Sequence, residues 1–599
     1  MNSWDAHRRQ GHLARQGRGI ARWLELRAIA MMPGQFDVEA GLRGGVIVAG
    51  PLLGLLISHD HLLAWAIFAA FWTCLADGGG PIGRRRTLLA GFAGGGTAIA
   101  FLGTWIAGWG QGPALTIGAA LVFVSALMPL WWRGTSVVAT LIGVVAVVAA
   151  GYPMAAGDAA RLALCFLAGS SWALLILTLL WRGDEASPPR RAVASVFACL
   201  ADMARDLSVH RPATIDPARY GQHRRAVRIA IERARTQLAS TGSEDAPTIL
   251  WLGAMLTRAD DAFHAMLALD HLRSPGEAAH DAAGPLATRL HMVERLIRYP
   301  KRSQPPATPL PLNDTPVSAG AIRTAWAVID DALTGPFDAP SASPPAPVAI
   351  SGKSGAAPSV LGHALRTAMA VLLVTVAARL LHLQYPYWTA MAVVVVLSPA
   401  RRQSVSRGIE RIIGSVVGGA LAVTVLHLTA ATPAVAILVL FATIVTLALR
   451  PVNYTLFVSV LTLLFVLVMH LLHPVDGIVT ARMVDNVLGS IVAIGATLLL
   501  MRGDAVSTGA LVDAAVDANR AYLTAIASGD PAAVATARRA AGLASCEAEI
   551  AVHAPDRLFG ATASAAEREA LSTARRLAGE AAVAWHDRNP TTRTSRPEA

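Results

Sequence analysis

Charged side chains lie within or beside strongly apolar stretches of this chain, where charge is unusual. Arg407 and Arg411 are four residues apart, so a helix would place both on one face. A guanidinium group is planar and always charged, and it donates paired hydrogen bonds to a carboxylate. These residue types at this spacing predict a binding site for an organic anion.

Asp485 lies about one helical turn inside the last apolar stretch, and Arg482 precedes it by three residues. A carboxylate within a membrane is costly and often relays protons. Proton coupling through Asp485 and Arg482 is therefore one interpretation, and a structural ion pair between them is the other. The first half of the chain has Cys165 at the corresponding position, so a relay here would belong to one half alone.

Aromatic side chains occur near the same charges and could contact the apolar part of an organic acid. Trp65 lies in one short apolar run, and Tyr387 and Trp388 begin a second one. Large aromatic rings offer apolar surface and a polar edge together. A belt of aromatic residues at the membrane interface would explain the same positions, so both interpretations remain open.

Several of these residues recur at a constant distance of 323 positions. Arg43 recurs as Arg366, Trp65 as Trp388 and Arg84 as Arg407. Arg43, Arg84 and Arg366 are therefore further substrate-binding candidates, although helix-end arginines that reach toward the interface are ordinary. Repeated glycines, suited to close helix packing or to a cavity, are Gly91, Gly95, Gly96, Gly414, Gly418 and Gly419. Tandem membrane repeats are typical of solute transporters.

The composition indicates a membrane protein. The chain has 599 residues, of which 54% are hydrophobic and 15% charged, and its mean hydropathy is +0.48. A soluble chain carries about 25% charged residues. Six apolar runs in each half are expected to span the membrane. They cover 41–58, 62–75, 87–108, 112–131, 136–151 and 160–181, and then 363–381, 387–397, 411–427, 433–449, 455–472 and 483–501.

The arginines between these runs predict the orientation. Positive charge gathers at 84–86 and 401–411, whereas 58–61, 109–113 and 427–433 contain no Lys or Arg. By the positive-inside rule, both termini and the central segment are cytoplasmic.

The sequence therefore predicts an all-α, polytopic membrane protein with two tandem six-span repeats, each followed by a helical cytoplasmic segment. The expected parts are a basic leader (1–40), the first repeat (41–182), a helical cytoplasmic domain (183–335), a Pro-rich linker (336–359), the second repeat (360–502) and a helical tail (503–599).

No residue set favours an enzyme, a metal site or a cofactor. The 4 cysteines form no CxxC pair. Three glycines at 78–80 are not followed by the Lys and Ser or Thr of a phosphate-binding loop. The net charge of +11 comes without a nucleic-acid-binding motif. Transport would therefore use an ion gradient or downhill flow.

The second half combines an aromatic start of a short span at 385–391, a Ser398-Pro399 turn, the spaced arginines with the glycines after them, and Arg482, Asp485 and Gly489. This combination resembles the fusaric acid resistance family, which comprises aromatic-acid exporters of bacterial inner membranes. The resemblance is close in the C-terminal block and looser in the N-terminal one. It implies a twelve-span pump that expels aromatic carboxylates with the proton gradient, in some relatives together with a periplasmic adaptor (membrane fusion) protein.

Three functions follow from these observations. The leading one is a secondary exporter of organic, above all aromatic, carboxylic acids across the bacterial inner membrane. A passive organic-anion channel is the first alternative, since related six-span modules occur in plant malate channels. A non-transport scaffold that presents its cytoplasmic helices is the second. The expected partners are a small organic anion and the lipid bilayer, with homo-oligomerisation open.

Overall fold

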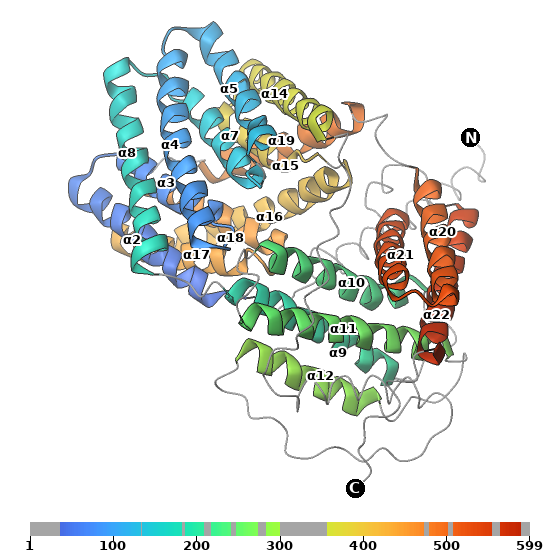
Figure 1. Cartoon of the computed structure of the whole chain (residues 1–599). Coiled ribbons are helices and arrows are strands. Elements are labelled where there is room, and N and C mark those ends of the chain that lie inside the picture. Colours follow the sequence, from blue (N-terminus) through green and yellow to red (C-terminus); the bar gives the residue numbers. More distant parts are fainter. Residues whose placement is uncertain are drawn as a thin grey trace, which may run out of the picture. The chain divides into compact units, whose positions relative to one another are not determined.

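The computed structural model is built of helices (Figure 1). It describes residues 36–132, 134–181, 186–208, 217–240, 247–272, 283–299, 356–399, 401–429, 431–472, 478–500, 507–553 and 564–588. Every regular element within these ranges is helical, which confirms the prediction of an all-α protein. The leader at 1–35 and the linker up to residue 355 lie outside the described residues.

The chain divides into two compact units. The first, here called the membrane unit, comprises residues 1–183 and 350–505; the second, called the accessory unit, comprises residues 184–349 and 506–599. The central segment and the tail therefore share one unit, although the second apolar block separates them in the sequence.

The membrane unit contains the apolar helices. Its first half comprises α2 (Val38–Ser58), α3 (Leu63–Ala76), α4 (Ile82–Ala107), α5 (Gln111–Ala126), the one-turn α6 (Met128–Trp131), α7 (Ser136–Ala150), α8 (Ala156–Leu175) and the π-helix η3 (Ile176–Leu180). Its second half comprises α14 (Ala356–Leu380), α15 (Pro386–Val396), α16 (Arg401–Leu428), α17 (Thr432–Leu449), α18 (Tyr454–Leu472) and α19 (Ile478–Leu500).

Nine helices in the described part of the chain are long and apolar enough to cross a membrane. The helices α3, α7 and α15 are apolar but have only 14, 15 and 11 residues. At 1.5 Å per residue, α15 extends about 17 Å, against a hydrocarbon thickness of about 30 Å. All twelve expected segments are thus helical, but three are too short for a straight crossing.

Two arginine-rich segments expected as loops are helical instead. The helices α4 and α16 begin at Ile82 and Arg401, so Arg84 and Arg407 lie inside helices. An apolar run marks only the part of a helix that meets lipid, whereas backbone hydrogen bonding continues beyond it. For the same reason α14 begins at Ala356, within the segment assigned to the linker.

Corresponding helices of the two halves have corresponding neighbours. In the first half, α8 packs on α3 and α4, and α7 packs on α4 and α5. In the second half, α19 packs on α15 and α16, and α18 packs on α16 and α17. Across the halves, α2 contacts α17 and α14 contacts α5. Each half therefore places its first helix against the fourth helix of the other half.

The short helices α3 and α15 are enclosed by other helices. Nearly every residue of both is buried, including Trp65 and Trp72 in α3 and Trp388 in α15. A helix that is apolar on all sides is expected in an interior. Pro386 begins α15, where its missing N–H costs no helical hydrogen bond.

The accessory unit combines helices from two separate stretches of the chain. The central stretch supplies α9 (Ser187–Ser208), α10 (Pro217–Ser240), α11 (Pro247–Leu272) and α12 (Ala283–Arg298). The tail supplies α20 (Thr508–Ser528), α21 (Pro531–Val552) and α22 (Ala565–Arg588). Contacts of α10 with α21 and of α11 with α22 join the two stretches. Asp530 caps α21 by accepting a 2.9 Å hydrogen bond from the amide of Ala532.

Candidate functional site

A buried cation lies at the centre of the candidate site. Arg482 of α19 is 3% exposed. Its guanidinium carbon lies 4.8 Å from the ring centroid of Trp388 and 4.9 Å from that of Phe465. Its Nε and Nη1 atoms have no hydrogen-bond partner among the described residues. A desolvated cation with unused donors is costly, so an anionic ligand would stabilise this arrangement.

A buried carboxylate follows one helical turn later. Asp485 accepts a 3.2 Å hydrogen bond at Oδ1 from the hydroxyl group of Thr389 on α15. Its Oδ2 atom has no partner within the described ranges. The structure describes both Asp485 and Arg482, and no side-chain nitrogen of Arg482 lies within 4.0 Å of a carboxylate oxygen of Asp485. The geometry therefore favours separate roles over a simple structural pair.

A second arginine reaches the same part of α19. Arg411 of α16 is buried, and its Nη2 atom donates a 3.1 Å hydrogen bond to Oδ1 of Asn486. The neighbouring Glu410 accepts a 3.1 Å hydrogen bond from the hydroxyl group of Ser406. Positions 482, 485 and 486 of α19 thus meet α15, α16 and α18 in one buried polar cluster.

A series of aromatic contacts leads from the first half of the membrane unit to this cluster. Trp65 of α3 meets Tyr152 edge-on with ring centroids 5.8 Å apart. The hydroxyl groups of Tyr152 and Tyr387 are 2.9 Å apart, and Tyr387 contacts Trp388 at 5.8 Å. Phe465 stacks on Phe68 of α3 at 5.1 Å. The two halves therefore meet through rings beside Arg482.

The comparison with known families matches part of the second half of the membrane unit. Residues 371–496 match the family model described as fusaric acid resistance protein-like. We call this matched stretch the fusaric acid resistance protein-like domain. Neither the curated proteins nor the solved structures contain a match to the chain. The domain and the apolar helices together indicate a multi-pass membrane transporter.

The polar cluster lies entirely within the fusaric acid resistance protein-like domain. Its corresponding positions in the first half can be found from two close helix contacts. An added Cβ at Gly489 would meet the backbone of Thr389, and one at Gly169 would meet the backbone of Ala66. Ala66 and Thr389 are 323 positions apart, and the two glycines are 320 apart.

This register places apolar residues where the domain has polar ones. Leu162, Cys165 and Phe166 correspond to Arg482, Asp485 and Asn486, and Leu88 corresponds to Arg411. Leu162 and Phe166 are fully buried. The arrangement of charges thus occurs in the second half only.

The candidate residues Trp65, Tyr387 and Trp388 do not form a lipid-facing belt. Trp65, Tyr387 and Trp388 are 6%, 9% and 4% exposed in the helical bundle. Residues of an interfacial belt would point outward. Their burial favours a role inside the transporter.

The remaining predicted arginines lie outside the cluster. Arg407 is half-buried and makes no hydrogen bond or ion pair with the described residues. Arg366 donates a 3.3 Å hydrogen bond to the carbonyl of Ser398, just beyond the end of α15. Arg43 is half-buried in α2, and Arg84 is exposed near the start of α4.

The repeated glycines lie at close helix contacts. A Cβ at Gly91 would meet Trp132 at 2.8 Å, and one at Gly96 would meet Phe166 at 2.6 Å. In the fusaric acid resistance protein-like domain, Gly414 and Gly418 face the backbone of α18, and Gly419 faces Met483. Gly95 is less crowded, with Ile142 at 3.2 Å. Close packing accounts for these positions.

Four residues of the site were missed by sequence reasoning. Phe465, Thr389 and Tyr152 lie among apolar or small residues, and nothing in their local sequence marks them. Asn486 could have been found, since it is a polar residue next to Asp485 in an apolar stretch.

Proposed function

We propose that the protein is a secondary exporter of organic acids, aromatic carboxylates above all, driven by the proton gradient across the bacterial inner membrane. One observation carries this proposal. The guanidinium group of Arg482, whose Nε and Nη1 atoms have no partner in the described part of the chain, lies beside the rings of Trp388 and Phe465 and one turn from Asp485. A cation that could bind a carboxylate, two aromatic rings that could contact its apolar part and a carboxylate that could accept a proton therefore lie close together.

The substrate's carboxylate would accept hydrogen bonds from Arg482. The Nε and Nη1 atoms are the donors left unused within the described structure, and each can donate a hydrogen bond to a carboxylate oxygen. The ring of the substrate would displace part of the contact between Arg482 and its flanking rings, Trp388 and Phe465. Tyr387 and Trp65 extend this aromatic surface toward the first half.

Asp485 would carry the proton. In its charged form it accepts from Thr389, and after protonation it would donate through the same carboxyl group while the threonine hydroxyl accepts. Because Asp485 and Arg482 lie one turn apart on α19, the charge of Asp485 would change the affinity of Arg482 for the substrate's carboxylate, which is the requirement for coupling.

The other candidate arginines would act along the route to this site. Arg411 would hold Asn486 and supply positive potential beside Arg482. We assign Arg407, Arg366, Arg84 and Arg43 to the attraction of anions at the cytoplasmic entrance. Arg450 at the end of α17 donates a 3.5 Å hydrogen bond to the carbonyl of Asp77, which directly follows α3. Several arginine-bearing helix ends thus share a side, which supports cytoplasmic termini.

Reconstitution of the purified chain in liposomes tests the proposal. We expect benzoate flux that follows an imposed pH gradient, stops on addition of an uncoupler and falls at least about tenfold in Arg482→Gln. Arg161→Gln is the matched control, since Arg161 of α8 pairs with Asp158 on the surface at 4.0 Å. Vesicles without protein report passive leakage of the acid.

Two outcomes would contradict the proposal. A benzoate conductance that persists when the pH gradient is collapsed would identify a channel. Equal flux in the parent and Arg482→Gln would remove the assigned site. Flux from the chain alone would in addition show that no periplasmic adaptor is required for the membrane step.

A further inference from the structure

The accessory unit encloses a cavity of about 210 Å³ between the central helices and the tail helices. Its walls come from α10 and α11 of the central stretch and from α20, α21 and α22 of the tail. Arginines, acidic residues, one tyrosine and apolar side chains line it together. The membrane unit contributes none of the lining residues.

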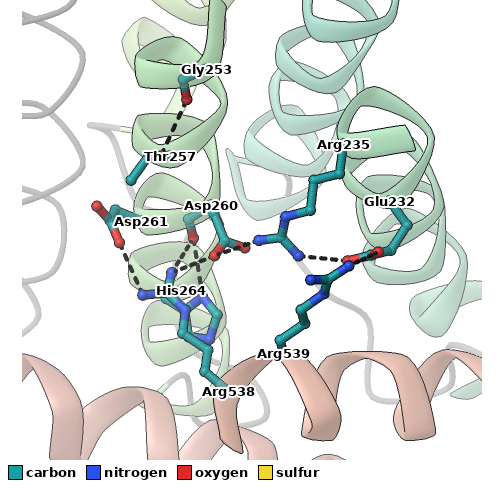
Figure 2. Close-up of polar contacts among 9 residues, drawn as sticks. All are labelled: Glu232, Arg235, Gly253, Thr257, Asp260, Asp261, His264, Arg538 and Arg539. Atoms are coloured by element: carbon teal, nitrogen blue, oxygen red, sulfur yellow. Dashed lines mark hydrogen bonds and ion pairs between the residues drawn. The ribbon is translucent and has the colours of Figure 1, made fainter. Parts of the chain in front are cut away.

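Most charges at this cavity are already paired. Figure 2 shows Arg235 between Glu232 and Asp260, at 2.5 and 3.3 Å. On α21, Arg538 donates a 2.9 Å hydrogen bond to Asp261 and lies 3.3 Å from Asp260, and Arg539 lies 3.6 Å from Glu232. In these contacts each of the three carboxylates, Glu232, Asp260 and Asp261, is paired with an arginine.

Two charged lining residues have no ion pair within the described structure, the exposed Glu547 and Arg228. Arg228 is the cation of the two. It lines the cavity, with its guanidinium carbon 5.7 Å from the ring centroid of Phe263. It makes no hydrogen bond or ion pair with the residues that the structure describes, and its buried Nε atom is unsatisfied. The acidic Glu549 nearby is held by Arg575 at 2.6 and 2.7 Å. Burial lowers the pKa of Arg228 from its usual value, and a bound anion would restore it.

The rest of the wall suits a flat apolar group. Phe263, Leu267 and Ile231 line the cavity and are almost completely buried. Tyr522 also lines it, and its hydroxyl group has no partner within the described residues. A cavity of about 150 Å³ holds a benzene ring. The volume here therefore accommodates such a ring together with a carboxylate.

We propose that this cavity binds a small, flat monocarboxylate, up to the size of benzoate, through Arg228. The carboxylate would accept from the guanidinium group, and the ring would lie against Phe263 and Leu267. The site belongs to the accessory unit and does not depend on the proposed transport site. It would let the accessory unit respond to the concentration of an organic acid.

Calorimetric titration of the full-length protein with benzoate tests this site. An Arg482→Gln background silences the proposed transport site, so that the two sites are measured separately. We expect saturable binding that weakens at least about tenfold in Arg228→Gln. The matched control is Arg233→Gln, an exposed arginine on the same helix that does not line the cavity.

A second variant fills the cavity without removing the charge. Gly542 of α21 lines it, and a Cβ added there meets no atom within 4 Å. Leucine favours a helix more than glycine does, so Gly542→Leu should fold at least as well as the parent. We expect it to lose benzoate binding while its thermal midpoint is unchanged or higher.

Benzamide and inorganic phosphate serve as comparison ligands. Benzamide has the ring without the charge, and phosphate has the charge without the ring, so both should bind at least about tenfold more weakly than benzoate. The proposal is overturned if benzoate does not bind to the parent protein. It is also overturned if Arg228→Gln and Gly542→Leu bind benzoate as tightly as the parent does. Phosphate that binds as tightly as benzoate would refute the ligand class.

Discussion

Thr389 on the short helix α15 donates a 3.2 Å hydrogen bond to Asp485 on α19. The contact joins a helix of 11 residues, too short to cross a bilayer, to a carboxylate of the buried polar cluster. A proton on Oδ1 of Asp485 would reverse the direction of this hydrogen bond. In the mechanism that we propose, protonation of Asp485 would therefore act on α15 through Thr389.

The first prediction concerns Asp485→Asn. An amide keeps a hydrogen bond with Thr389 but cannot exchange a proton, so we expect uphill, pH-driven flux of benzoate to be lost. Exchange of labelled for unlabelled benzoate across the membrane should persist, since it needs no net proton movement. Both are measured in proteoliposomes.

The control for this variant is Asp158→Asn in the first half, where the carboxylate is exposed. That change should leave both kinds of flux as in the parent. The relay role of Asp485 would be wrong if the Asn variant kept pH-driven accumulation with an unchanged pH dependence.

The second prediction compares two arginines one turn apart. Arg411 is buried and bonded to Asn486, whereas Arg407 is half-buried without such a contact in the described structure. We expect Arg411→Gln to reduce benzoate flux about 10- to 100-fold, the usual effect of losing a buried charged hydrogen bond. Arg407→Gln should have a clearly smaller effect, with equal amounts of both variants in the membrane. Equal losses in the two variants would count against the cluster.

Much of the helical architecture could be predicted from the sequence. The apolar runs located all twelve hydrophobic segments because lipid selects continuous apolar stretches. The extent of α16 could not be predicted in this way, since its first turns carry arginines and lie outside the apolar run. The packing of the central stretch against the tail could not be predicted either, because contacts between distant segments leave no local pattern in the sequence.

The candidate site could be predicted only in part. Arg411, Asp485 and Trp388 were recognisable because charged or aromatic residues are rare in apolar segments. The position of Arg482 beside Phe465 and Trp388 was not, since it depends on the contacts among α15, α18 and α19. Sequence spacing suggested a pair with Asp485, and the three-dimensional arrangement separates the two groups.

The third prediction concerns the contact between α15 and α19. A Cβ at Gly489 would come within 2.8 Å of the Cβ of Ala392 and collide with the backbone of Thr389. Gly489→Ala should therefore destabilise the membrane unit by about 1–3 kcal/mol, the usual cost of overpacking. Gly495→Ala on the same helix is the control, because a Cβ there meets no atom within 4 Å. Thermal inactivation in detergent measures both, and equal midpoints would contradict the close packing.

The fourth prediction concerns the acid stability of the accessory unit. Burial and the charge of Arg538 lower the pKa of His264 from 6.5 to about 3, against the opposing effect of Asp260. Below pH 6.5, His264 binds a proton in the unfolded chain but stays neutral in the folded unit. The stability of the unit should therefore fall as the pH drops from about 6.5 toward 3, by up to about 1.4 kcal/mol per pH unit.

His264→Phe tests this slope, since phenylalanine keeps a ring beside Tyr522 and Trp585 but cannot be protonated. Denaturation at pH 7 and pH 5, followed by a short deuterium pulse at one common pH, reports the opening of residues 247–272. The parent should lose more stability between the two pH values than the variant. Parallel losses would assign the acid sensitivity to other groups.

The split composition of the accessory unit imposes an order on its synthesis. The helix α12 ends at Arg298, but α20 does not begin until Thr508, about 210 residues later. At ribosomal rates of about 5–20 residues per second, the first four helices wait roughly 10–40 s for their partners. During this interval the faces of α10 and α11 that contact α21 and α22 are uncovered, so the nascent chain is a candidate client for chaperones until the final three helices emerge.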